Sequence, residues 1–163
     1  MNRIIFDTEP DMSTPEKVRN ILNSTGAFSE QEIEVALEIV RENLEKGSQK
    51  SGYNFLLVRG DSGQIAGFAC FGPIACTKSG YDLYWIAVHK DFQGMGLGKK
   101  LFQETERQVR KLKGAKIYAE TSGRRDYLPA RKFYQSLGFS KSCRLKDFYA
   151  PGDDKLILQK DLN

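Results

Sequence analysis

A glycine-rich segment between a strand-like stretch and a helix-like stretch constrains the fold of this chain most. Residues 93–100 read QGMGLGKK, an apolar run precedes them at residues 84–88, and a helical pattern follows from Leu97 and Leu101. The first turn of a helix leaves about four backbone N–H groups without partners, and glycines let an anion come close to the backbone. The sequence therefore predicts an α/β chain that holds a phosphate-bearing ligand at this junction.

The spacing of the glycines excludes two common nucleotide-binding loops. Gly94, Gly96 and Gly98 follow the pattern G-x-G-x-G, whereas a dinucleotide fingerprint needs G-x-G-x-x-G. A nucleoside-triphosphate loop needs G-x-x-x-x-G-K-[ST], but residue 93 is glutamine and Lys99 is followed by Lys100. Both the first glycine and the metal-binding hydroxyl of that loop are missing.

The length predicts one domain, and the cysteines and the histidine predict free thiols and no metal site. A chain of 163 residues is expected to form a single domain over residues 1–163 with a substantial core. Cys70, Cys76 and Cys143 are odd in number and form no C-x-x-C pair, so neither a disulfide framework nor a zinc site is expected. Because free thiols are typical of a reducing compartment, the location expected is cytoplasmic. Cys70 and Cys76 are expected in the core. His89, the only histidine, lacks partner ligands and is expected at the surface.

The charge pattern argues against nucleic-acid and membrane partners. The net charge is +4, and Glu104 and Glu106 interrupt the most basic stretch, residues 99–116, as in a solvated helix face. Nucleic-acid binding calls for a wider basic face with interleaved aromatics. The alternative is an RNA-associated protein whose affinity for nucleic acid depends on salt. No apolar stretch is long enough for a signal peptide or a membrane span, so a soluble protein is expected.

Helix signals occur at four places. Thr14 followed by a proline predicts an N-cap for a helix to about residue 23, and Ser29 with Glu32 forms a capping box for a helix that ends at Gly47. A third helix is expected over residues 96–113, ended by the next glycine, and a fourth from about residue 128 to 137. The side chains expected to point inward from the third helix are Leu97, Leu101, Val109 and Leu112.

Strand signals alternate with these helices. The stretch 60–63 is expected to be a hairpin turn, and Pro73 indicates an edge or a bulge. A strand, a helix and a strand around the glycine loop imply a parallel crossover. The fold class expected is α/β, with a mixed, mostly antiparallel sheet of about six to seven strands, a central parallel β-α-β crossover and helices on both faces. Strands are expected near residues 4–6, 53–59, 65–76, 81–88, 116–121, 139–148 and 155–160.

Two motifs in the same order resemble those of a known family. The pattern Q-x-x-G-x-G at residues 93–98 is similar to the acetyl-CoA signature of the GNAT superfamily of N-acetyltransferases. The pattern A-x-x-x-Y-x-x-x-G-F at residues 130–139 resembles a second motif of that family. The resemblance covers roughly residues 53–160 and implies the GNAT fold, acetyl-CoA as cosubstrate and acetyl transfer. Tyr127 stands where many members carry an asparagine that contacts the pantetheine.

The resemblance also implies which residues contact the coenzyme. In the family the glycine loop binds the pyrophosphate, and the preceding strand contacts the pantetheine arm. A backbone N–H of that strand, here that of Val88, stabilises the oxyanion. The implied coenzyme-binding residues are Ile86, Ala87, Val88, Gln93, Gly94, Met95, Gly96, Leu97, Gly98 and Lys99.

Acetyl transfer to an amine needs a base for the amine and a proton for the departing thiolate. Tyr134 matches the general-acid tyrosine of the family, although an aromatic packed into the core is the alternative. Two carboxylates compete as the base. Glu120 follows apolar strand residues that would raise its pKa, and Asp82 shares a strand face with Tyr84. A structural ion pair is the alternative role for each carboxylate.

The acceptor stays open at this level. Phe148 and Tyr149 lie in a turn-containing segment where peptide N-terminal acetyltransferases of the family place tyrosines, and Tyr84 is the third candidate substrate contact. A small amine, a lysine side chain and a peptide N-terminus are all compatible. We expect direct transfer in a ternary complex, in a monomer or homodimer. A non-catalytic CoA-binding module is the alternative.

Overall fold

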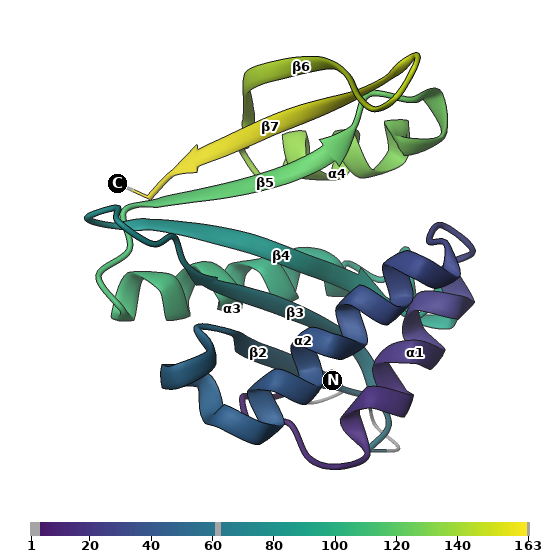
Figure 1. Cartoon of the computed structure of the whole chain (residues 1–163). Coiled ribbons are helices and arrows are strands. Elements are labelled where there is room, and N and C mark those ends of the chain that lie inside the picture. Colours follow the sequence, from purple (N-terminus) through teal and green to yellow (C-terminus); the bar gives the residue numbers. More distant parts are fainter. Residues whose placement is uncertain (1–3, 61–62, 163) are drawn as a thin grey trace. The chain divides into compact units, whose positions relative to one another are not determined.

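The computed structural model describes residues 4–60 and 63–162 (Figure 1). Two short 3₁₀ helices lie at Lys90–Phe92 and Arg125–Tyr127. Of the expected hairpin turn, Asp61 and Ser62 lie outside the described residues. The helices and strands in chain order are β1 (Ile5–Asp7), α1 (Thr14–Thr25), α2 (Glu30–Ser51), β2 (Asn54–Arg59), β3 (Ile65–Pro73), β4 (Gly80–Val88), α3 (Leu97–Lys111), β5 (Lys116–Ser122), α4 (Leu128–Ser136), β6 (Ser140–Ala150) and β7 (Asp153–Asp161).

The strands form one mixed sheet in the order β1-β2-β3-β4-β5-β7-β6. The pair β4–β5 is parallel, whereas β1–β2, β2–β3, β5–β7 and β6–β7 are antiparallel. Parallel strands need a crossover connection, and here α3 provides it. The predicted fold class, a mostly antiparallel sheet with one central parallel β-α-β crossover, is therefore confirmed.

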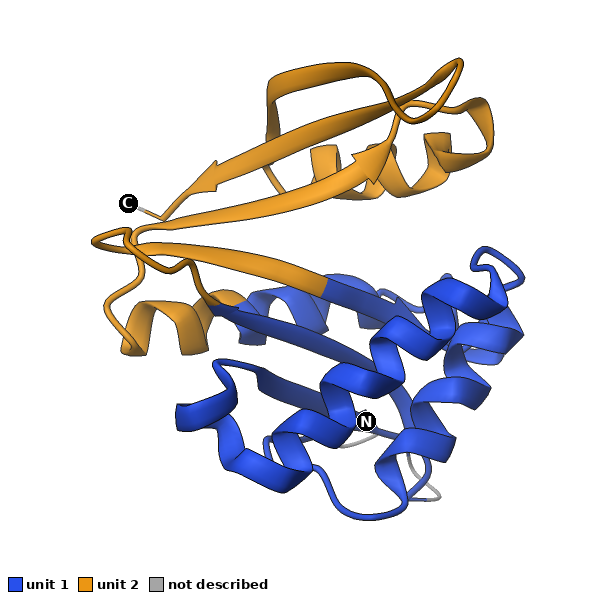
Figure 2. Ribbon diagram, in the orientation of Figure 1, with its two compact units in different colours: residues 1–72, 85–105 blue, residues 73–84, 106–163 orange. Residues whose placement is uncertain are grey.

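Contacts within the chain divide it into two compact units (Figure 2). The first unit comprises residues 1–72 and 85–105, and the second comprises residues 73–84 and 106–163. Strand β4 and helix α3 each contribute to both units. A single family domain over residues 1–163 stays a prediction.

Both faces of the strands in the first unit are buried. Residues 55–58 of β2 are all buried, although successive side chains of a strand point to opposite faces. Phe55 and Leu57 pack with α1 and α2, and the first part of α3 lies on the other side of these strands (Figure 2). In this unit helices therefore cover both faces of the sheet, as the sequence predicted.

The N-terminal helices follow their local signals with two differences. The predicted capping box of α2 is present, because Ser29 accepts from the Glu32 N–H and the Glu32 carboxylate accepts from the Ser29 N–H. Gly47, with φ of 75° and ψ of 165°, is non-helical and interrupts α2 as predicted, but a further helical segment follows it and ends at Ser51. The predicted N-cap at Thr14 is wrong, since Thr14 is already helical and its hydroxyl accepts a hydrogen bond from the Asp11 N–H.

Gly67 allows β3 to approach β4 closely in the first unit. A Cβ atom at this position would lie 2.8 Å from the carbonyl oxygen of Ala87 and 3.2 Å from a methyl group of Val58. We predict that Gly67→Ala lowers the free energy of unfolding by about 1–3 kcal/mol, because a backbone carbonyl in a sheet cannot move aside. Denaturant unfolding measures the change. Gly60→Ala is the control, since its Cβ makes only ordinary contacts, at 3.6 Å or more, and an equal loss in both variants would contradict the steric account.

The second unit joins β5, β7 and β6 with α4.

Two predictions at the end of α3 are wrong. Leu112 is 49% exposed, because α3 ends at Lys111 and Leu112 leaves the inward-facing stripe. Lys113 takes the left-handed conformation, with φ of 62°, in place of the following glycine. Gly114 instead fits tightly, because a Cβ there would lie 2.3 Å from Val109 and 2.7 Å from Tyr81.

The cysteines do not share one environment. Cys70 is buried within β3, as predicted, and desolvation raises the pKa of its thiol well above the usual range. The prediction that Cys76 is a core residue is wrong, because β3 ends at Pro73 and Cys76 lies exposed with φ of 64° in the following turn.

Within the described ranges no helix is long and apolar enough to cross a bilayer.

Candidate functional site

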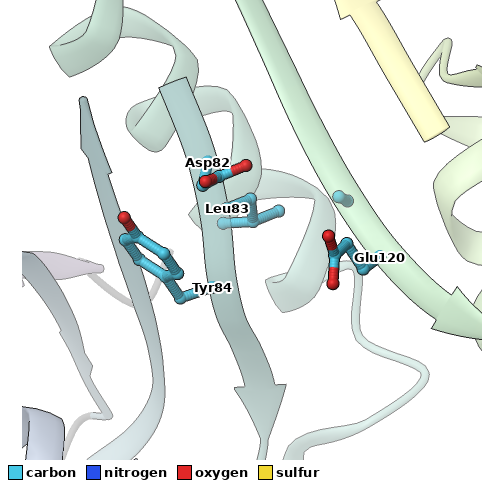
Figure 3. A pocket seen from close by; sticks show the side chains of 5 residues that line it. Asp82, Leu83, Tyr84 and Glu120 are labelled. Atoms are coloured by element: carbon cyan, nitrogen blue, oxygen red, sulfur yellow. The ribbon is translucent and has the colours of Figure 1, made fainter. Parts of the chain in front are cut away.

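A pocket opens in the second unit where the parallel pairing of β4 and β5 stops. The paired register runs from Gly80 with Lys116 to Asp82 with Tyr118, but both strands continue further. The pocket has a volume of about 180 Å³, and Figure 3 shows the side chains that line it. The residues that line it are Asp82, Leu83 and Tyr84 of β4 and Ala119 and Glu120 of β5.

Three of the predicted site residues share one face at this pocket. Asp82 is opposite Tyr118 in the register, so the alternation along each strand puts Asp82, Tyr84 and Glu120 on the same side of the sheet. Leu83 and Ala119 are buried. The pocket thus combines two carboxylates and a phenol with two buried apolar residues.

The two carboxylates differ in their surroundings. Desolvation and the negative charge of Glu120 raise the pKa of Asp82, and the ammonium of Lys155 opposes them. Asp82 has no hydrogen bond or ion pair within residues 4–60 and 63–162. Glu120 instead forms an ion pair with Lys155, at 2.5 Å between Oε2 and Nζ.

Lys155 also contacts Phe148 of the neighbouring strand. The Lys155 ammonium lies 4.5 Å from the centre of the Phe148 ring, in a cation–π contact, and its side chain is only 15% exposed. Phe148 packs edge-on against Tyr149 at 5.1 Å between ring centres. The predicted aromatic pair therefore adjoins the carboxylates through Lys155, a residue that the sequence reasoning missed.

The acidic residues of the β6–β7 hairpin hold the hairpin itself. Asp153 accepts a hydrogen bond from Ser122 and pairs with Arg124 at 3.7 Å. Asp154 pairs with Arg144 and accepts from the Asp147 N–H at 2.8 Å. Asp153 and Asp154 are buried. These two carboxylates are consequently occupied by partners within the fold.

Tyr134 lies on α4 and packs against Phe139, with 5.4 Å between the ring centres. Its hydroxyl has no hydrogen-bond partner in the part of the chain that the structure describes. Burial raises the pKa of Tyr134 to about 12. The phenol therefore keeps its proton at neutral pH, and the ring contact shows that the predicted core packing is present as well.

Arg131 fixes α4 to the end of β5. Its guanidinium donates to the carbonyl of Ser122 at 2.9 Å and to that of Arg124 at 2.6 Å. Arg131 lies three residues before Tyr134, so the two are neighbours on one helix face. The helix that carries the phenol is thus anchored to the end of β5 in the same unit.

The glycine loop lies in the first unit, between a 3₁₀ turn and α3. Gly94 and Gly96 have φ values of 75° and 74°, and nothing lies within 4 Å of a Cβ placed on either. Gln93 donates from its side-chain amide to the carbonyl of Val88 at 3.0 Å. This bond ties the loop to the end of β4.

The loop leaves backbone donors available. Within the described residues the N–H groups from Gly94 to Lys99 donate to no acceptor, and the first bond into α3 is from Lys100 to Gly96 at 3.2 Å. Lys99, Lys100 and Met95 are exposed. Unpaired N–H groups, a helix N-terminus and nearby ammonium groups suit a phosphate-bearing group. The loop therefore fits the pyrophosphate that the sequence predicted.

The structure brings some of the predicted residues together. Asp82, Tyr84 and Glu120 meet at one pocket, and Phe148 and Tyr149 adjoin it through Lys155. Tyr134 lies on α4 of the same unit, and residues 86–99 lie in the other unit. Among the described residues no group of His, Cys, Asp or Glu side chains is placed to hold a metal ion. His89 caps the 3₁₀ turn by accepting from the Asp91 N–H.

Comparison with known proteins decides the family. Residues 51–141 match the family model described as acetyltransferase (GNAT) domain. The chain belongs to the GNAT family. The matched range includes both the glycine loop and the second motif at residues 130–139, so the family assignment rests on the same segments that the sequence pattern indicated.

Solved structures of GNAT proteins agree with this assignment. A protein of Desulfovibrio desulfuricans assigned to the GNAT family of acetyltransferases is 40% identical, with a TM-score of 0.93, and the match covers 99% of this chain and 100% of that one. No curated protein matches the chain.

Two more distant structures share the fold and were solved with the coenzyme. An aminoglycoside 6′-N-acetyltransferase complexed with coenzyme A is 14% identical, with a TM-score of 0.75 and coverage of 98% and 97% of the two chains. A protein of Salmonella typhimurium solved with acetyl-CoA is 17% identical, with a TM-score of 0.72 and coverage of 99% and 95%. These two structures show the shared fold, and the family makes this GNAT protein an acyltransferase.

Proposed function

We propose that this GNAT protein transfers the acetyl group of acetyl-CoA directly to a primary amine in a ternary complex. The observation that carries the proposal is the pocket where β4 and β5 separate, which holds Asp82 and Glu120 on one face of the sheet. An amine that is to attack a thioester must lose a proton, and a carboxylate with a raised pKa is suited to take it. The raised pKa of Asp82 supports this role.

The glycine loop is the proposed site for the pyrophosphate of acetyl-CoA. The free N–H groups from Gly94 to Lys99 and the open space over Gly94 and Gly96 support it. By the family resemblance, Ile86 and Ala87 contact the pantetheine and the Val88 N–H donates to the oxyanion. Acetyl-CoA supplies the acetyl group and the thiolate that leaves.

Tyr134 is the proposed donor of the proton that the thiolate needs. Its pKa of about 12 means that the phenol is protonated throughout the physiological range. The proton balance closes over one turnover, because the ammonium nitrogen loses two protons: a carboxylate in the pocket takes the first and passes it to solvent, and the second, lost as the amide forms, replaces the proton that Tyr134 gives to the sulfur. The products are an N-acetylated amine and free CoA.

The acceptor that fits the pocket is a primary amine carried by a small molecule or a peptide. Asp82 and Glu120 bear negative charge and Lys155 bears positive charge, so the pocket is net anionic and attracts an ammonium group. Tyr84, which is 38% exposed, is the proposed apolar contact for the carbon skeleton.

A panel of acceptors tests this function. The full chain is mixed with acetyl-CoA and with polyamines, amino acids, aminoglycosides, lysine peptides or peptides with a free N-terminus, and free thiol is measured. We expect thiol release that depends on one acceptor class and saturates with it. A chain that binds CoA but releases no thiol with any amine would be the non-catalytic module and would refute the proposal.

The proposed role of Tyr134 makes a separate prediction. Tyr134→Phe should lower kcat by about tenfold or more, because the departing thiolate loses its proton donor. The unfolding free energy should stay the same or rise, because the hydroxyl has no partner among the described residues. Steady-state kinetics and denaturant unfolding measure the two quantities. Unchanged turnover would show that Tyr134 is only a packing residue.

A further inference from the structure

Lys155 is a partly buried cation beside the pocket that the proposed function leaves without a role. Its side chain is 15% exposed, although lysine is rarely buried unless it is paired. Its ammonium has a carboxylate of Glu120 on one side, at 2.5 Å, and the ring of Phe148 on another, at 4.5 Å. Two contacts from two different strands thus hold one flexible side chain in place.

The register explains why Lys155 faces the pocket. Ser122 of β5 is opposite Lys155 of β7. Glu120 precedes Ser122 by two residues and therefore lies on the same face of the sheet as Lys155. The same alternation puts Asp82 on this face, and the Lys155 charge acts on its carboxyl group. A single ammonium therefore influences both candidate bases.

The ion pair makes the two carboxylates chemically unequal. A carboxylate that accepts a proton gives up its negative charge, so Glu120 would have to lose its pairing with Lys155 in order to act as the base. Asp82 loses no ion pair on protonation, since it has none within the described residues. The cost of taking the proton of the acceptor is consequently lower for Asp82.

We propose that Lys155 is a positioning residue that holds Glu120 in an ion pair and so leaves Asp82 as the carboxylate that takes the proton of the acceptor amine. The proposal rests on the proposed function. Phe148 supports the ammonium from the β6 side, which gives this exposed aromatic a role besides any contact with the acceptor.

Other charged groups share this face of the sheet. Lys116 and Asp161 pair with each other at 3.1 Å, and Asp153 pairs with Arg124, so these charges are already balanced. The titratable and charged groups that the register places on this face are Asp82 and Tyr84 of β4, Lys116, Tyr118 and Glu120 of β5, Cys143 of β6 and Asp153, Lys155 and Asp161 of β7.

The test is the pH profile of Lys155→Met beside those of Lys155→Arg and the unchanged chain. Removing the ammonium takes away an interaction that lowers the pKa of Asp82, so the acid limb of kcat/KM should move to higher pH. Arginine keeps the positive charge and should restore the original limb. An unshifted limb in Lys155→Met would overturn the proposal.

Lys160→Met is the matched control. Lys160 lies on the same strand, is similarly buried at 20% exposure and pairs with Glu106 at 2.7 Å, but the register puts it on the opposite face of the sheet. Its loss should leave the acid limb in place. A shift equal to that of Lys155→Met would mean that any broken ion pair on β7 has this effect, which would also overturn the proposal.

A second measurement tests the role of Lys155 without relying on acetyltransferase activity. Carbon NMR of the labelled Asp82 carboxyl group in the full chain reports its titration directly, and we expect the Asp82 pKa to rise in Lys155→Met and to stay unchanged in Lys160→Met. If the unchanged chain acetylates no amine, the proposed function fails while this titration still decides the role of Lys155. If acetylation occurs but neither the profile nor the titration moves, only the inference about Lys155 fails.

Discussion

Asp82→Asn is expected to lower kcat/KM by about 100-fold or more, the range that a general base contributes. The asparagine has nearly the same shape but cannot take the proton of the acceptor. The acid limb of the pH profile should disappear along with the activity. In the unchanged protein this limb should lie at higher pH than for an ordinary aspartate, because burial and Glu120 raise the pKa of Asp82 and activity should be lost as the pH falls through it.

Glu120→Gln is the matched comparison for this variant. It removes the other carboxylate on the same face of the pocket. A neutral amide then stands where the Glu120 carboxylate pairs with Lys155. We expect kcat/KM to fall by no more than about tenfold, because the base remains. The opposite order, with the larger loss in Glu120→Gln, would assign the base to Glu120 and contradict the role given to Asp82.

Gly96→Ala is the second change with a large expected effect. Its φ of 74° is a left-handed conformation that costs an alanine about 1–2 kcal/mol, and an alanine strained in this way should disturb the N–H groups that face the ligand. We expect the dissociation constant for CoA to rise about tenfold or more, with kcat at saturation largely unchanged. Calorimetry and steady-state kinetics measure these two quantities.

Gly52→Ala provides the control for backbone strain. Gly52, at the end of α2, has a φ of 76° and nothing within 4 Å of a Cβ, so it matches Gly96 in both respects. Both variants should lose similar unfolding free energy, of about 1 kcal/mol, but only Gly96→Ala should bind CoA more weakly. Equal affinity in the two variants would show that the loop does not hold the coenzyme.

The sequence predicts the glycine loop and the parallel crossover because both depend on local patterns. The spacing from Gln93 to Gly98 excludes other phosphate loops without any tertiary information. The capping box at Ser29 is equally local, since its two hydrogen bonds join residues three apart. Such features follow from neighbouring residues, and the structure reproduces them.

Lys155 shows what a sequence pattern cannot supply. Its contact with Glu120 depends on β7 lying next to β5, with β6 at the edge, and on the register between the two strands. Both are non-local. The exposure of Cys76 has a similar origin, because the chain leaves the sheet at Pro73 although the apolar pattern continues. In the sequence Lys155 is only the first residue of an expected strand.

The most direct test of the central claim counts both products of one reaction. The full chain, acetyl-CoA and the best acceptor of the panel are incubated together, and free CoA and acetylated amine are measured by mass spectrometry. We predict equal amounts of the two, with the acetyl group on nitrogen, and almost none of either with Asp82→Asn. Free CoA without acetylated amine, or an acetyl group on oxygen, would contradict acetyl transfer to a primary amine.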